Sequence, residues 1–353
     1  MLKAPAGSRG RLVAEALQGS WRPSPTALEC EALKLEEIAP LLQRSGAAAL
    51  CWWRIQSSVL RDTPLAKSFQ KVYRLNCLQA VLTQQTIKET IALLRSSGIE
   101  PILVKGWAAA RAYPEQGLRP YGDIDLCVRP EQFAAAEKTL NTLSFKQCEV
   151  DLHAGFEKLG GGSIDEIYAR SQLARLDETE VRVASAEDHL RVLSIHMLRE
   201  GAWRPLWLCD IAAVVESLPA NFDWDACLVE NRRQADWIIC AIKLSEQLLG
   251  ADISRTPAAH RTRELPRWLV PTVLKEWETL EPAMTERHRA PMAQHLRYPA
   301  EILKGLYNRW PNPIEATISV RGPFNDLPRF PFQLGNCLAR TAKFTARLPK
   351  LLR

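Results

Sequence analysis

The hydrophobic periodicity changes twice along these 353 residues, and this change constrains the fold more than any other feature. From about residue 11 to 97, apolar residues recur every three or four positions, as in FQKVYRLNCLQAVLTQQTIKETIALLRSSG. This spacing predicts amphipathic helices, with Gly98 as the C-terminal cap of the last one. After about residue 185 the helical spacing returns, and Ser185 with Asp188 predicts a helix start there.

Between these helical regions the sequence shows short strand patterns. Three segments are apolar or alternate with period two: residues 99–104, 123–128 and 150–153. Both patterns are typical of strands. Residues 106–113 and 130–143 are expected to be helical, and the Pro- and Gly-rich residues 114–122 to form a loop.

The patterns together predict a predominantly helical α+β fold, in which helical regions flank a core built on a small mixed β-sheet. We expect an N-terminal helical region at 1–97, the strand-containing core at 98–184 and a C-terminal helical domain at 185–353.

Composition sets broad limits on the class of protein. Apolar residues make up 46% and charged residues 24%, as in ordinary soluble domains. No run approaches the roughly 20 apolar residues that cross a bilayer, and the N-terminus lacks a signal-peptide pattern, so a cytoplasmic location is expected. The nine cysteines form no CxxC pair, and neither a zinc site nor a disulfide framework is expected. The net charge of +6 is compatible with anionic substrates such as nucleotides, but many proteins without such substrates carry a similar charge.

Asp123 and Asp125 form the most informative pair in the sequence. In a strand, residues i and i+2 point to the same face, about 6.6 Å apart along the chain. Two such carboxylates repel each other unless a cation or an arginine neutralises them. Their hard oxygen atoms suit Mg²⁺, and Gly122 just before them permits close approach of a ligand to the backbone. The pair therefore predicts a magnesium site.

A third carboxylate is usual in such sites. Asp151, in the motif VDLH, is the best-placed acid, and His153 shares its strand face. Asp151 is expected to bind metal or to act as the base for the attacking oxygen. His153 is expected to orient Asp151 or to contact the substrate. The alternatives are an exposed strand carboxylate and a histidine at a sheet edge.

Lys105 and Gly106 lie where an expected strand ends and a helix begins. Glycine leaves room for a phosphate to approach the backbone, and free N–H groups at a helix start favour anions. Lys105 and Arg119 could add charge-assisted contacts to a triphosphate. Two metal ions roughly 3.5–4 Å apart on the opposite side would complete an arrangement that suits phosphoryl or nucleotidyl transfer.

The segment KGWAAARAYPEQGLRPYGDIDLCV resembles the uncharacterised nucleotidyltransferase family of bacterial proteins, within the superfamily that includes DNA polymerase β. VDLHAGF is similar to the Asp-Leu-His strand of that family, and SAEDHLRVLSIHMLREGAWRPLWLCDIAAVVES to its downstream helices. The resemblance runs from about residue 97 to 217. It implies that Asp123, Asp125 and Asp151 bind metal and that Gly106 lies near the triphosphate. Trp107 stands where the wider superfamily commonly has serine, and the Gly106–Asp123 gap is longer than usual.

These observations lead to one main expectation and two alternatives. The main one is transfer of a nucleoside monophosphate from an NTP, with ATP as the expected donor, to a hydroxyl acceptor with release of pyrophosphate. The acceptor could be a small molecule, a peptide or protein side chain, or an RNA end, and the resemblance adds a peptide-tailoring role as an option. The alternatives are a kinase using the same site and a non-catalytic nucleotide- or partner-binding protein, which Trp107 favours.

Other features receive a structural interpretation. His189 and His196 share a helical face and are expected to cap or pack a helix. Asp210 interrupts an apolar stripe and needs a buried partner, for which Arg204 and Arg199 are the candidates. The last 25 residues carry six basic side chains and no acidic one, a pattern that fits nucleic acid, an anionic membrane, an acidic peptide or simple solvation. Nucleic-acid binding is not inferred from it.

Overall fold

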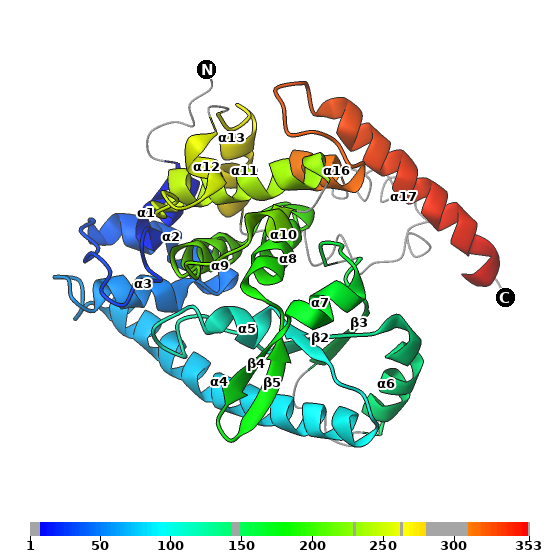
Figure 1. The fold of residues 1–353 in the computed structure, drawn as a ribbon. Coiled ribbons are helices and arrows are strands. Elements are labelled where there is room, and N and C mark those ends of the chain that lie inside the picture. Colours follow the sequence, from blue (N-terminus) through cyan, green and yellow to red (C-terminus); the bar gives the residue numbers. More distant parts are fainter. Residues whose placement is uncertain are drawn as a thin grey trace.

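A computed structural model describes residues 8–142, 149–157, 159–228, 231–261, 264–279 and 310–351. Helices form most of the molecule and surround one five-stranded sheet (Figure 1). The prediction of a predominantly helical α+β fold with a small mixed sheet is therefore confirmed.

Four helices precede the sheet: α1 (Arg9–Leu17), α2 (Ala32–Ser45), α3 (Ala48–Ile55) and α4 (Pro64–Ser96). Thr63 caps the start of α4, because its hydroxyl accepts a hydrogen bond from the N–H of Ala66. Gly98 follows the end of α4 with φ 74°, and the N–H of Ile99 donates to the carbonyl of Leu94. This is the left-handed glycine cap that the sequence predicted.

The sheet contains β1 (Ile102–Val104), β2 (Asp123–Val128), β3 (Glu149–Ala154), β4 (Gln172–Leu176) and β5 (Thr179–Val183). Its order is β3-β2-β1-β5-β4; β2 is parallel to β3 and antiparallel to β1, and β1 is parallel to β5. The three predicted strands are confirmed. The β4–β5 hairpin, which turns at Asp177 with φ 51°, was not predicted.

The two faces of the sheet contact different helices. Ile124, Leu126 and Val128 pack in a cluster with residues of α4 and of α6 (Phe133–Leu140). The intervening Cys127 packs on the opposite face, in a cluster that includes Val192 of α8 (Ala186–Arg199). Because side chains alternate along a strand, Asp123 and Asp125 belong to the same face as Cys127.

The remaining helices connect the strands or follow the sheet in the sequence. Between β1 and β4 these are α5 (Gly106–Ala110), the 3₁₀ turn η1 (Pro130–Gln132) and α7 (Ile164–Arg170). After α8 come α9 (Pro205–Glu216), α10 (Trp224–Leu228), α11 (Arg232–Leu249), α12 (Pro257–His260), α13 (Leu269–Trp277), α16 (Pro313–Ser319) and α17 (Phe330–Leu351). Ser185 caps α8 by accepting from the N–H of Asp188, as the sequence predicted.

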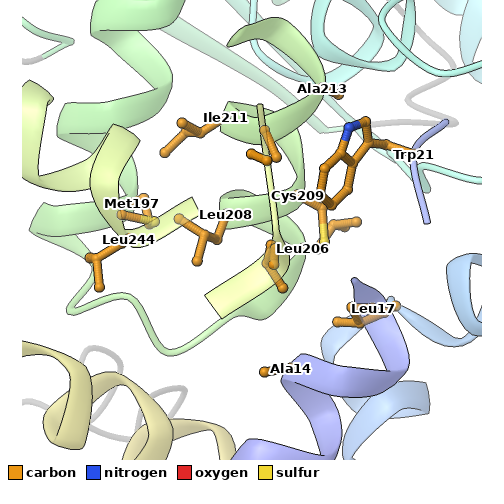
Figure 2. Packing of buried hydrophobic residues seen from close by; sticks show 14 of the residues in the cluster. Ala14, Leu17, Trp21, Met197, Leu206, Leu208, Cys209, Ile211, Ala213 and Leu244 are labelled. Carbon is orange, nitrogen blue, oxygen red and sulfur yellow. The ribbon is translucent and has the colours of Figure 1, made fainter. Parts of the chain in front are cut away.

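The largest core joins helices from both ends of the chain. Leu17, the last residue of α1, and Trp21, just after this helix, pack in one cluster with Leu206 and Cys209 of α9 (Figure 2). The regions predicted at 1–97 and 185–353 thus contribute to one hydrophobic cluster. Within the described ranges, no helix combines the length and apolar character that a bilayer crossing requires.

Candidate active site

The strand register brings Asp125 and Asp151 together. Asp125 lies opposite Val104 of β1 on one side and opposite Asp151 of β3 on the other. Residues paired across neighbouring strands project from the same face of a sheet. The parallel pairing of β2 and β3 therefore places two carboxylates side by side, although 26 positions separate them in the sequence.

Two polar side chains contact the carboxylate of Asp125, and one of them also contacts Asp151. The Nζ atom of Lys105 lies 2.5 Å from its Oδ1 atom. The Nε2 atom of His153 lies 3.2 Å from the same oxygen and 3.3 Å from Oδ2 of Asp151. Asp125 is buried, with 3% of its surface exposed, whereas Asp151 is exposed. The site thus has a closed side at Asp125 and an open side at Asp151.

The surroundings of Asp125 keep it ionised. Burial opposes its charged form, but the hydrogen bond from His153 and the charge and hydrogen bond of Lys105 outweigh this effect, so the pKa of Asp125 lies below its usual value. A buried carboxylate held as an anion is the form that binds a cation.

An unusual backbone turn sets the position of Lys105. Its φ is 55° and its ψ is −147°, and the next residue, Gly106, has φ 38°. A residue with a β-carbon rarely adopts positive φ, and such strain is concentrated at functional sites. A Cβ added to Gly106 would lie 3.4 Å from the carbonyl oxygen of Asp123, so the turn also packs closely on the start of β2.

Asp123 occupies a different position from Asp125. It is exposed, as is the preceding Gly122, at the first residue of β2. In the described part of the chain, one group of three ligand-capable side chains lies within 4.8 Å: Asp125, Asp151 and His153. Metal binding by Asp123 remains a prediction. His153, for which the sequence offered an orienting or substrate role beside that of a histidine at a sheet edge, is the third member of the group.

Arg119 has buried partners. Its guanidinium forms an ion pair with Asp210 of α9, with 2.8 Å between Nη2 and Oδ2, and it also donates to the carbonyl of Pro120. The hydroxyl of Tyr113 donates to the same carboxylate over 2.8 Å. Burial opposes the charge of Arg119, but the attraction and hydrogen bonds of Asp210 prevail and raise its pKa.

This network corrects one expectation and changes another. The partner of Asp210 is Arg119, whereas Arg204, one of the two candidates, donates through Nε to the carbonyl of Ser45. Arg119 was expected to contact a triphosphate. In the structure it ties the loop before β2 to α9, and only 5% of its surface is exposed.

Helices α8 and α9 place aromatic and cationic groups beside the site. The ring of His196 meets Trp207 edge-on at 4.7 Å between centroids, and the guanidinium carbon of Arg204 lies 5.9 Å from the Trp207 centroid. Burial and then the charge of Lys105 lower the pKa of His196 to about 3. Burial and then the charge of Arg119 lower that of Arg204 to about 10. Arg204 and Trp207 belong to the sequence motif WRPLW, whose local pattern predicts a helix start and not a position beside the site.

A family comparison gives this geometry its context. The profile of a family described as "Uncharacterised nucleotidyltransferase" matches residues 31–158 and 142–237, more than half of the chain. The chain belongs to this family. The match includes all the residues that meet at Asp125, and the resemblance noted in the sequence is confirmed. Neither the curated proteins nor the solved structures gave a match.

The donor set of this family member fits a divalent cation. Asp125 and Asp151 offer carboxylate oxygens, which Mg²⁺ prefers, and His153 offers an imidazole nitrogen. The ammonium group of Lys105 already contacts one oxygen of Asp125, so a cation would use the other oxygen or displace that contact. The exposed Asp151 leaves the group accessible from solvent.

Proposed function

We propose that the protein transfers a nucleoside monophosphate from an NTP, with ATP as the expected donor, to a hydroxyl acceptor and releases pyrophosphate. One observation supports this proposal: in a member of the nucleotidyltransferase family, the parallel pairing of β2 and β3 brings ligand atoms of Asp125, Asp151 and His153 within 4.8 Å of one another. A strained turn with a lysine borders the same group.

In this proposal Asp125 and Asp151 hold Mg²⁺, and Asp123 provides a further carboxylate for a second ion. When bound, the ions would neutralise the phosphates and lower the pKa of the attacking hydroxyl. Asp151 is the exposed acid of the group, and its carboxylate is suited to accept the proton of that hydroxyl. His153 contacts both carboxylates and keeps their side chains oriented.

The phosphate side of the site is proposed to use Lys105 and the backbone at Gly106. Both residues have positive φ at the turn between β1 and α5, and Gly106 has no β-carbon that would hinder a phosphate from approaching the backbone. Arg119 acts indirectly, because its ion pair with Asp210 fixes the loop that leads into β2. We therefore assign it a positioning role in place of a phosphate contact.

Lys105 also favours a second candidate, a non-catalytic nucleotide-binding protein. Its ammonium group supplies the positive charge that the buried Asp125 requires, so the carboxylate does not need a cation for its neutralisation. This candidate predicts nucleotide binding without transfer to any acceptor.

Labelled nucleotides separate these functions. The purified protein is incubated with Mg²⁺, candidate acceptors and NTPs labelled at either the α or the γ phosphate. Nucleotidyl transfer predicts α label on the acceptor and release of pyrophosphate; a kinase would transfer γ label and release ADP when ATP is the donor. The Asp125→Asn variant should lose transfer by at least a hundredfold, in the range of roughly 2.7–4 kcal/mol for losing one electrostatic catalytic group.

Glu178→Gln is the matched control, because this carboxylate is 93% exposed in the β4–β5 turn and away from the group at Asp125. It should retain full activity. Transfer of α label that survives in Asp125→Asn would contradict the site assignment. Nucleotide binding with no transfer to any acceptor offered would support the non-catalytic candidate.

A further inference from the structure

The outer face of α4 carries an apolar patch that the proposed function does not use. Leu75 is 53%, Leu78 64%, Val81 58% and Leu82 52% exposed. The inner face of the same helix is buried in the sheet cluster through residues such as Ile87. Single exposed apolar residues are ordinary, but four large ones within two helical turns mark an interaction surface.

The spacing along this face is that of a coiled coil. Six exposed residues, called the stripe below, follow one another at intervals of four, three, four, three and four: Lys71, Leu75, Leu78, Leu82, Gln85 and Glu89. Alternating intervals of three and four form the a and d positions of a heptad pattern. The 18 residue steps from Lys71 to Glu89 correspond to about five turns, so both ends lie on the same line of the helix, about 27 Å apart.

We infer that α4 docks against α4 of a second copy of this chain as an antiparallel two-stranded coiled coil centred near Ala80. In this register Leu78 faces Leu82 of the partner subunit, and Leu75 faces Gln85 of the partner subunit. Lys71 then faces Glu89 of the partner subunit. The two-fold symmetry repeats each pair, as an interface between identical surfaces requires.

The charges at the two ends of the stripe favour a second copy of this chain as the partner, and they favour an antiparallel arrangement of the two helices. A parallel pair would place lysine against lysine and glutamate against glutamate at the two ends of the stripe, and like charges at these positions are unfavourable. The antiparallel pair places opposite charges together at both ends. A uniformly charged surface, such as an anionic membrane, would complement Lys71 and repel Glu89. The stripe is therefore complementary to itself.

The position of α4 permits this contact. The helix runs along the lower edge of the molecule in Figure 1, and its inner side is fixed to the loop before β2. Asn76 donates to the carbonyl of Gly117, and Gln84 donates to the hydroxyl of Tyr121. On the outer side Gln85 donates to Glu89 over 2.7 Å, which orients that carboxylate within the stripe. Docking on the outer side leaves the group at Asp125 open.

Sedimentation equilibrium over a wide range of concentrations tests the inference. The full-length protein should show a dimer that dissociates on dilution, and Leu78→Glu should be monomeric at every concentration. Leu33→Glu is the matched control, because Leu33 is 77% exposed on helix α2, and it should dimerise like the natural protein. Circular dichroism of each variant should show unchanged helix content, since all the substituted side chains are exposed.

A charge exchange tests the register. Lys71→Glu alone or Glu89→Lys alone creates two like-charged pairs and should raise the dimer dissociation constant about tenfold. The double variant restores opposite charges and should restore the affinity. A protein that stays monomeric throughout, or a dimer that Leu78→Glu leaves intact, would overturn the inference. Failure of the double variant to recover would overturn the antiparallel register.

Discussion

At the scale of single residues, two buried carboxylates are each stabilised by two neighbouring side chains. Asp125 is held by Lys105 and His153, and Asp210 by Arg119 and Tyr113. The two networks differ in exposure: the first opens to solvent through Asp151, whereas both charged members of the second are almost completely buried. We therefore expect the first network to carry chemistry and the second to carry stability.

Removing Asp210 should be strongly destabilising. Asp210→Ala leaves the guanidinium of Arg119 buried without its counter-ion, a change that destabilises proteins by about 3–5 kcal/mol. Urea unfolding followed by circular dichroism measures this loss. Asp165→Ala is the control, because the carboxylate of Asp165 is 77% exposed in its pair with Arg129, and exposed pairs contribute about 0–1 kcal/mol. Equal losses in the two variants would contradict the structural role of Asp210.

His189 should make stability depend on pH. Its Nε2 atom is buried and has no hydrogen-bond partner among the described residues, and burial lowers its pKa from 6.5 to about 4. Between these values the unfolded chain binds a proton that the folded chain excludes, so stability falls as pH decreases from about 6.5 toward 4. At pH 5 this effect reaches about 2 kcal/mol relative to pH 7.5.

Replacement of His189 by glutamine removes that titration. The difference in unfolding free energy between pH 7.5 and pH 5, measured by urea unfolding at both values, should shrink by about 2 kcal/mol in His189→Gln. An unchanged difference would show that His189 binds its proton equally well in the folded and unfolded states.

At the scale of elements, the stability of α4 depends on the left-handed conformation of Gly98 at its C-terminal end. Gly98 adopts φ 74°, and no atom lies within 4 Å of the position that a β-carbon would take, so alanine there would meet backbone strain without a steric clash. Gly98→Ala should lower the unfolding free energy by about 1 kcal/mol. Gly122→Ala also meets open space but has no positive φ, and it should leave stability within about 0.5 kcal/mol. Equal losses of unfolding free energy in the two variants would contradict the capping role of Gly98.

Sequence patterns predicted the elements that carry a strong local signal. The strand at 123–128 was predicted with its observed bounds, and the caps at Gly98 and Ser185 follow from local hydrogen bonding. The hairpin formed by β4 and β5 was missed because its pairing adds two short strands to the far edge of the sheet. Such pairing is a tertiary property, which strand propensity alone does not determine.

The sequence predicted which residues belong to the candidate site, but it did not predict the contacts between them. The D-x-D pattern identified Asp125, and VDLH identified Asp151 and His153. Their convergence requires the parallel register of β2 and β3, for which a single sequence gives no direct signal. Arg119 was expected at phosphate because it is a cation beside the motif, but its partner Asp210 lies 91 positions away on α9. Long-range ion pairs of this kind become visible only in the folded structure.

At the scale of the whole molecule, the two ends of the chain share one core. The first and last helical regions contribute to the same cluster, and α1 packs closely on α13. A β-carbon at Gly10 would lie 2.1 Å from the carbonyl oxygen of Leu274, so Gly10→Ala forces these helices apart. We expect a loss of about 1–3 kcal/mol.

Calorimetry should show where that loss occurs. Because α1 and α13 belong to one cluster, Gly10→Ala should lower the Tm of a single transition that includes helices from both ends. Two separate transitions, with only the first shifted by the substitution, would contradict a shared core.

The central claim is that the group at Asp125 binds a nucleotide through a divalent cation. The acceptor does not enter this claim, so binding tests it most directly. Isothermal titration calorimetry with a non-hydrolysable ATP analogue should show binding in the presence of Mg²⁺ and none in its absence. Asp125→Asn should abolish this binding, while Glu178→Gln retains it. Equal binding with and without Mg²⁺, or full binding by Asp125→Asn, would contradict the account.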